Sequence, residues 1–279
     1  MIAFGDGNIK PFSVSLPVQE HLAGGLILGG GPETSRLVSR DERYIDIDNL
    51  QAGGRYEFRA VALFGSQESQ AVSVFANSAC GTGRTDVVFL VHATQDNAYS
   101  EETVKNFLSK VMSSIGQLGP DATQVGLSAY SFRARPWILL NRSSDLSTVL
   151  QQIRTIPFEE PSGTSIGAAI DFAKNYMFTT NYGRRNNVPG TLVVLADGPS
   201  GDDVLEPARV MKDAGFKILA VGTNGADQEQ LRRIVSRQSP RNVFFTRDSG
   251  NLNSLVDSLT GAICTVTPVE GEKGQKGEL

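Results

Sequence analysis

From Asp86 onward, short apolar segments alternate with longer segments whose apolar residues recur at helical spacing. The short segments have the length of buried strands, and the longer ones suit helices that pack against them. We expect strands at 87–91, 125–130, 192–195, 218–221 and 243–245, with a further one around Trp137. Because strands that alternate with helices form parallel sheets, the pattern predicts a doubly wound, mostly parallel α/β domain over residues 84–264, with helices on both faces.

The apolar stripes define the expected helices. The longest comprises Val104, Phe107, Leu108, Val111, Met112, Ile115 and Leu118. Gly119-Pro120 is expected to end this helix, and two more stripes lie within 146–153 and 252–263. Such stripes are typical of core-facing surfaces, so we assign none of them to a cofactor.

Residues 44–76 show a different pattern. Apolar and polar residues alternate at 44–47, 56–63 and 71–75, and glycine-rich turns separate these segments. This alternation is typical of half-buried strands joined by turns. We expect an antiparallel β module before the α/β domain.

Charge and hydropathy exclude some functions. The formal net charge is −4, whereas nucleic-acid-binding proteins concentrate basic residues on one face. We expect no nucleic-acid partner, and we interpret the basic clusters 183–185 and 231–233 as solvated faces without a functional role. The sequence has no run of 18 apolar residues, so we expect no membrane span.

Two cysteines, Cys80 and Cys264, bracket the periodic part of the chain. Their placement favours a disulfide bond, which requires an oxidising compartment; two free buried thiols are the alternative. Asn141-Arg142-Ser143 is an N-glycosylation sequon, which has meaning in a secreted protein. The segment after Met1 does not resemble a secretory signal, so we interpret Met1 as the start of a fragment.

Glycine occupies every third position at Gly271, Gly274 and Gly277. Only glycine fits the crowded axis of a collagen triple helix, so residues 271–279 predict the start of such a helix after a hinge at 265–270. Nine residues are too few to hold a trimer. We expect this chain to be monomeric and the full-length parent to be a homotrimer.

Three polar loops are expected to meet at one edge of the sheet. They are 92–96 after the first strand, 162–167 before a helix, and 197–203 after a later strand. In doubly wound sheets, ligands bind beyond the carboxyl ends of the strands. We therefore expect the candidate site at this edge.

Residues 84–264 resemble von Willebrand A domains, which have a Rossmann-like fold and often bind Mg²⁺ through an Asp-x-Ser-x-Ser loop, a distant Thr and a distant Asp. Thr164 and Asp197 match this pattern, but His92, Thr94 and Asp96 stand where Asp, Ser and Ser are usual. Imidazole is a poor Mg²⁺ ligand. The resemblance thus implies a degenerate site without a metal cofactor, in which His92 and Asp197 hydrogen-bond.

Residues 1–79 resemble part of a fibronectin type III domain, because Leu50 precedes Tyr56 by six residues as in its tyrosine corner. Ala52 replaces the usual Pro, and no early Trp is present. We expect a partial or degenerate β-sandwich.

The segments 89–97, 183–185 and 226–233, with the order of modules, resemble A-domain collagens of the anchoring-fibril type. This resemblance implies a secreted structural and adhesion protein of the extracellular matrix and basement membrane that binds fibrillar collagen and other matrix proteins.

Two other functions are alternatives. An Mg²⁺-dependent receptor-type A domain would use the same edge of the sheet. A hydrolase would need His92 as its base, but the sequence has neither a Gly-x-Ser-x-Gly nor a His-Glu-x-x-His motif. We expect no enzyme activity.

Overall fold

The computed structural model describes residues 84–95 and 101–264, except 144, 160, 162, 224 and 237–241, together with Gln70 and seven strands between Phe12 and Asn77. Several predicted features lie outside the described residues: Cys80, Asp96, the hinge at 265–270 and the triplet glycines Gly271, Gly274 and Gly277.

The N-terminal strands form antiparallel pairs, as the alternation predicts. They are β1 (Phe12–Ser13), β2 (Ala23–Gly29), β3 (Thr34–Val38), β4 (Asp46–Ile47), β5 (Arg55–Phe64), β6 (Gln67–Glu68) and β7 (Val72–Asn77). One sheet has the order β3-β2-β5-β6, with β7 also paired to β5, and β1 pairs with β4. Strand β2 is rich in glycine, which lowers strand propensity, so its sequence gave little sign of a strand.

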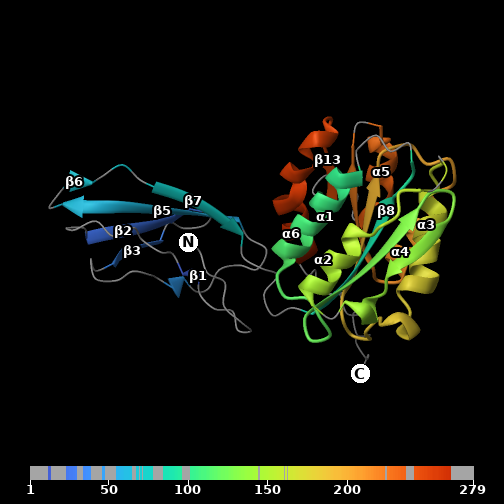
Figure 1. Ribbon diagram of the computed structural model, residues 1–279, viewed down its shortest axis with the longest axis horizontal. Coiled ribbons are helices and arrows are strands. Elements are labelled where there is room, and N and C mark those ends of the chain that lie inside the picture. Colours follow the sequence, from blue (N-terminus) through green and yellow to red (C-terminus); the bar gives the residue numbers. More distant parts are fainter. Residues whose placement is uncertain are drawn as a thin grey trace, which may run out of the picture.

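The α/β unit contains one six-stranded sheet with the order β10-β9-β8-β11-β12-β13. In Figure 1, β8 of this sheet lies between helices α1 and α3. The strands of the sheet are β8 (Thr85–His92), β9 (Thr123–Tyr130), β10 (Ala134–Ile138), β11 (Gly190–Ala196), β12 (Lys217–Gly222) and β13 (Val243–Phe245). All neighbours are parallel except β10, an antiparallel edge strand. The mostly parallel sheet predicted from sequence is confirmed.

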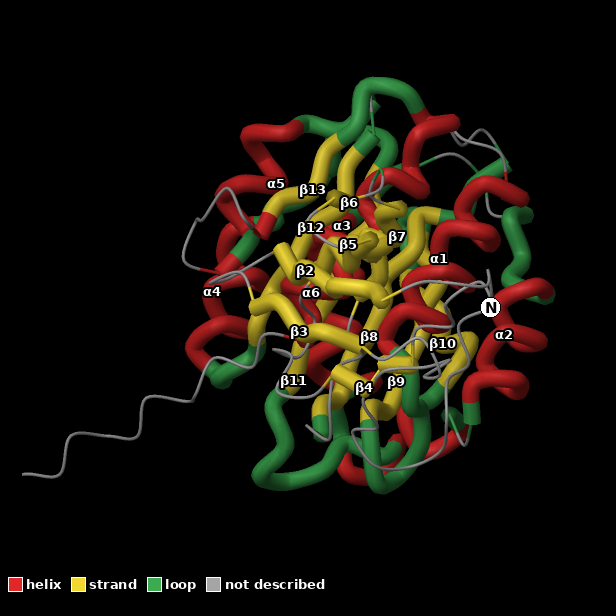
Figure 2. The backbone as a smooth tube through the Cα atoms, turned by 90° about the vertical axis from the view of Figure 1, so that its left-hand side faces the viewer, coloured by secondary structure: helices red, strands yellow, loops and turns green. Residues whose placement is uncertain are grey.

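Helices cover both faces of this sheet, and in Figure 2 α4 and α5 lie on one side of the strands with α1 and α2 on the other. The α-helices are α1 (Glu101–Ile115), α2 (Leu146–Arg154), α3 (Ile166–Phe172), α4 (Leu205–Asp213), α5 (Gln228–Ile234) and α6 (Val256–Cys264). The shorter helical segments are η1 (Leu140–Arg142), η2 (Ala173–Met177, a π-helix), η3 (Thr180–Tyr182) and η6 (Ser249–Leu255).

Two helix boundaries differ from the sequence prediction. Helix α1 ends at Ile115 rather than at Gly119, because Gly116 has a φ of +90°, a left-handed conformation that ends helices. The predicted helix at 252–263 divides into the 3₁₀ segment η6 and the α-helix α6.

Successive residues of the central strand β8 enter two separate cores. Val87, Phe89 and Val91 pack with α1, α2 and α6, whereas Val88 and Leu90 pack with α3, α4 and α5. A strand buried on both faces needs apolar residues at every position, which explains its continuous apolar run. Within the described part of the chain, no helix is long and apolar enough to span a membrane.

The strand order also locates the candidate site. From β8 the chain proceeds to β9 and β10 on one side, and then crosses to β11, β12 and β13 on the other. The topological switch point therefore lies between the carboxyl ends of β8 and β11, where a doubly wound sheet opens a crevice for ligands.

Candidate functional site

His92 and Asp197 meet at this switch point. His92 is the last residue of β8, and Asp197 directly follows β11, its parallel neighbour. The Nδ1 atom of His92 is hydrogen-bonded to the Asp197 carboxylate. Both residues are buried, with exposed fractions of 4% and 7%. The hydrogen bond predicted from the sequence is present.

The other ring nitrogen of His92 contacts the loop before α3. Nε2 lies 2.8 Å from the Gly163 carbonyl oxygen and 3.3 Å from Thr164 Oγ1. A carbonyl oxygen and a carboxylate only accept hydrogen bonds, so each ring nitrogen must donate. This arrangement requires the positively charged imidazolium form of His92.

The pKa of His92 reflects the same contacts. Burial lowers it, but the hydrogen bond and charge of Asp197, with the Gly163 carbonyl, outweigh burial and raise the pKa above its usual 6.5. The Tyr130 ring lies 5.2 Å from the imidazole. Burial, followed by the charges of Asp197 and Asp202, raises the Tyr130 pKa, so its phenol stays neutral and donates to the Leu195 carbonyl.

Two further residues define the edge of this site. Gly163 has a φ of +152°, and a Cβ placed on it would lie 2.4 Å from the Phe132 ring, so the position requires glycine. Phe132 covers this loop yet is 61% exposed, the largest value among the large apolar side chains described. Thr94, a predicted site residue, is buried, and Asp96 lies outside the described residues.

The loop after β11 binds the N-terminus of α3. Ser200 Oγ accepts from Ile166 N at 2.7 Å, and the Asp202 carboxylate accepts from Gly167 N and Ala168 N. Unpaired N–H groups at a helix start are a ready anion site. Here those groups are already paired with a hydroxyl and a carboxylate, so this helix end does not offer an anion site.

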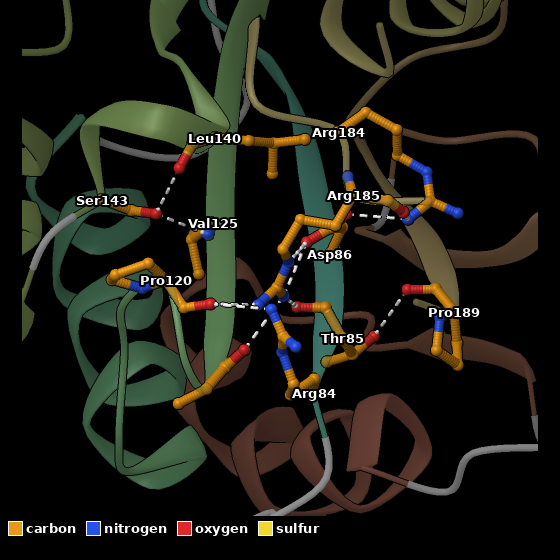
Figure 3. Close-up of polar contacts among 11 residues, drawn as sticks. Arg84, Thr85, Asp86, Pro120, Val125, Leu140, Ser143, Arg184, Arg185 and Pro189 are labelled. Carbon is orange, nitrogen blue, oxygen red and sulfur yellow. Dashed lines mark hydrogen bonds and ion pairs between the residues drawn. The ribbon is translucent and has the colours of Figure 1, made fainter. Parts of the chain in front are cut away.

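A second buried ionic cluster lies at the opposite ends of the strands (Figure 3). Asp86, 0% exposed, accepts hydrogen bonds from Arg184 Nη1 at 2.7 Å and from Arg185 N and Nε at 2.9 and 2.8 Å. Arg185 also donates to the carbonyls of Thr85, Pro120 and Ala122. The prediction that 183–185 is a solvated face without a role is wrong.

The sequence contained one sign of this cluster, because an acidic residue at the start of a buried strand needs a partner. By contrast, Arg232 and Arg233 are exposed and lie 3.5 and 3.6 Å from Glu229. The second basic cluster is therefore a solvated helix face, as predicted.

The remaining predicted residues lie away from the switch point. Asn141 is exposed, in η1 after the edge strand β10. Cys264 is buried in the last turn of α6 and is disulfide-bonded. Its predicted partner, Cys80, is outside the described part of the chain.

Fold and site together define a class of protein: a doubly wound α/β domain with its candidate ligand site at the carboxyl edge of the sheet. Residues 86–258 match the family model of the von Willebrand factor type A domain. The chain belongs to this family.

The curated relatives cover the same part of the chain. Collagen alpha-4(VI) chain of Mus musculus is 33% identical over 194 residues, which are 68% of this chain and 8% of the relative. Matrilin-1 of Homo sapiens is 31% identical over 66% of this chain and 37% of its own length, and Matrilin-4 of Mus musculus is 32% identical over 69% and 31%. The chain thus spans well under half of these relatives.

Among solved structures, proximal thread matrix protein 1 from the mussel byssus, described with a zinc-occupied MIDAS motif, superposes with a TM-score of 0.61. It is 22% identical and covers 67% of this chain and 47% of its own. This likeness shows the shared fold.

Proposed function

We propose that this chain is a secreted structural and adhesion module of the extracellular matrix whose A domain binds fibrillar collagen and other matrix proteins. Family membership and the names of the relatives, a collagen chain and matrilins, support matrix adhesion. Matrix structural and adhesion proteins among the relatives also favour a role without catalysis.

In this proposal, binding does not use a metal ion. The observation that supports metal independence is the His92–Asp197 pair. Both ring nitrogens of His92 are engaged as donors, so neither offers a lone pair to a cation. The imidazolium charge neutralises Asp197 and opposes a divalent cation beside it. Thr164 retains a hydroxyl, but this donor set does not fit Mg²⁺, which prefers carboxylate and water oxygens.

The partner is proposed to contact the edge of the sheet next to this pair. Phe132 is 61% exposed and lies against Gly163, beside the neutralised ion pair. An exposed aromatic ring in such surroundings suits an uncharged, proline-rich surface like that of a collagen triple helix, since aromatic residues bind extended proline-rich chains.

The parent protein is proposed to be an anchoring-fibril collagen of the basement membrane, similar to type VII collagen and a homotrimer through its triple helix. The antiparallel N-terminal sheet β3-β2-β5-β6, with β7 also paired to β5, and the separate β1–β4 pair support a fibronectin type III-like sandwich before the A domain. The glycine triplets at 271–279 support a collagenous segment after it.

The test is solid-phase binding of the chain to fibrillar collagen with Mg²⁺ or with EDTA. We expect the same affinity in both buffers, and an affinity about tenfold weaker for Phe132→Ala, the loss that a central aromatic contact of about 1.4 kcal/mol produces. Trp137→Ala, on the edge strand β10, is the matched aromatic control and should bind like wild type. Loss of wild-type binding in EDTA would establish the Mg²⁺-dependent receptor-type alternative instead.

A second experiment restores the Asp that A domains usually have at position 92. His92→Asp would place two carboxylates together at the switch point, so its melting temperature should rise on addition of Mg²⁺ while that of wild type stays constant. His92→Asn, which adds no charge, is the control. A wild-type response equal to that of His92→Asp contradicts metal independence.

The hydrolase alternative conflicts with the geometry of His92. A general base needs an unprotonated nitrogen within reach of its substrate, whereas both nitrogens here donate to protein oxygens and the side chain is buried. Hydrolysis of a generic ester panel that His92→Ala abolished would revive this alternative.

A further inference from the structure

Three aromatic rings are stacked on the surface beside the π-helical segment η2. Phe172 and Tyr176 have ring centroids 4.9 Å apart and planes 18° apart, and Tyr176 and Tyr182 have values of 4.1 Å and 25°. All three side chains are partly exposed. The Tyr182 side chain, followed by slight burial, raises the pKa of Tyr176.

The stack is open at its Tyr182 end. Tyr176 is stacked with both Phe172 and Tyr182, whereas among the described residues no ring other than Tyr176 is stacked on Tyr182. The segment 175–183 contains no charged residue. The Tyr182 end of the stack is therefore a partly exposed aromatic ring in a segment of uncharged residues, which Lys174 and Arg184 flank.

Asn141, the acceptor of the glycosylation sequon, lies at this end. Its Nδ2 atom is 3.5 Å from the Asn181 carbonyl oxygen. Gly183, with a φ of +102°, approaches so closely that a Cβ on it would lie 2.3 Å from the Asn141 backbone nitrogen. The residues on both sides of Tyr182 thus contact Asn141.

Asn141 and Ser143, the two residues that define the sequon, have different environments. Ser143 is buried, where its Oγ accepts from Val125 N at 3.0 Å and donates to the Leu140 carbonyl at 2.9 Å. Asn141 is exposed, and its amide carries two hydrogens, so replacement of one by a sugar leaves a donor for Asn181. A glycan on Asn141 is compatible with the folded domain.

We propose that Asn141 carries an N-linked glycan whose first N-acetylglucosamine rings pack on Tyr182, the open end of the Phe172–Tyr176–Tyr182 stack. Sugar rings have apolar C–H faces, which pack on the faces of aromatic rings. In the attachment step, Asn141 Nδ2 bonds to the anomeric carbon of the sugar. The bond from that carbon to the diphosphate of a lipid-linked donor breaks, and the lipid diphosphate and one amide proton leave.

This inference rests on the secreted location in the proposed function. The experiment compares wild type with Asn141→Gln, each with and without Tyr182→Leu, produced by secretion from mammalian cells. Mass spectrometry should find the glycan on Asn141. We expect Asn141→Gln to lower the melting temperature by about 2 to 4 °C when Tyr182 is present, and by less than about 1 °C in the Tyr182→Leu background.

Two controls isolate the packing of the sugar. The same four chains made in bacteria without the glycan measure the effect of the side chains alone, and Phe132→Leu tests an exposed aromatic residue at the switch point. In NMR spectra, ring currents should shift the protons of the first sugar upfield in wild type, and Tyr182→Leu should remove this shift. This readout does not depend on stability.

An unmodified Asn141, or sugar protons that do not respond to Tyr182→Leu, overturns the inference. In either case, binding to fibrillar collagen that stays insensitive to EDTA leaves the proposed function intact. If the glycan packs on Tyr182 but the chain does not bind collagen, the inference about the glycan holds and the proposed function is wrong.

Discussion

Asp86 shows how one buried charge can organise several loops. Its carboxylate accepts from Arg184 and from both the backbone and side chain of Arg185. Since Arg185 also binds carbonyls of the segment before β9, the cluster joins the starts of two parallel strands to the loop before β11.

Removal of the Asp86 carboxylate should strongly destabilise the domain. Asp86→Ala leaves two arginines without their anion, and breaking a buried ion pair in this way costs about 3–5 kcal/mol. Urea denaturation measures the loss. Asp213→Ala removes an exposed carboxylate that also pairs with an arginine, and should change stability by less than about 1 kcal/mol. Equal effects of the two substitutions would contradict the role assigned to Asp86.

His92 should make stability depend on pH. Its folded-state pKa is raised above 6.5, so the folded protein holds the proton more tightly than the unfolded chain does. The resulting stabilisation is fully present below about pH 6.5 and is lost as the pH rises through the folded-state pKa.

Urea denaturation between pH 6 and pH 9 tests this direction. The unfolding free energy of wild type should fall further over this range than that of His92→Gln, in which the titrating group is absent. Other groups titrate in both chains, so the difference between the two profiles is the measurement. Parallel profiles would show that Asp197 does not hold the proton on His92.

At the scale of elements, the start of α3 depends on close backbone approach as well as capping. A Cβ on Gly167 would lie 1.9 Å from the Asp203 carbonyl oxygen, in the loop that caps this helix. Helix propensity alone favours alanine over glycine by about 1 kcal/mol. At Gly167 the contact with the loop decides whether alanine stabilises or destabilises the domain, because a backbone oxygen has little room to move.

Gly167→Ala should therefore destabilise the domain by about 1–3 kcal/mol, the usual cost of overpacking. In the same region, a Cβ on Gly201 would be 3.8 Å from its nearest neighbour, so Gly201→Ala should change stability by less than about 0.5 kcal/mol. Denaturation in urea distinguishes the two. A more stable Gly167→Ala chain would mean that the loop after β11 shifts easily.

The elements themselves were largely predictable, because the apolar periodicity that defines each one lies within a short stretch of sequence. The stripe that begins at Val104 became α1, and the short apolar segments became the strands of the sheet. Errors arose where backbone conformation overrode the stripe. Helix α1 ends before Leu118 because Gly116 is left-handed, and the glycine-rich β2 lacks the side chains that identify a strand.

At the scale of the whole molecule, Cys264 at the end of the last helix is disulfide-bonded. We expect its partner to be Cys80. In the chain-entropy model, so long a loop stabilises the fold by at most about 5 kcal/mol, and measured values are usually about 2–4 kcal/mol. Peptide mapping without reduction should recover the two cysteine peptides linked.

Replacement of both cysteines by serine should lower the melting temperature, and a reducing agent should then have no further effect. Wild type in the reducing agent should resemble the double variant. Alkylation of both thiols in the unreduced, denatured chain would exclude the bond between them.

The sequence by itself determined the order of strands and helices, the doubly wound sheet and the edge at which His92, Thr164 and Asp197 meet. These follow from periodicity and from the rule that parallel strands end at one edge. Only the tertiary structure decided that Arg184 and Arg185 bind Asp86 across 98 and 99 positions of the chain. It also decided that His92 donates from both nitrogens and that Tyr182 stacks beside Asn141. Such contacts depend on how distant segments approach one another, which no local pattern records.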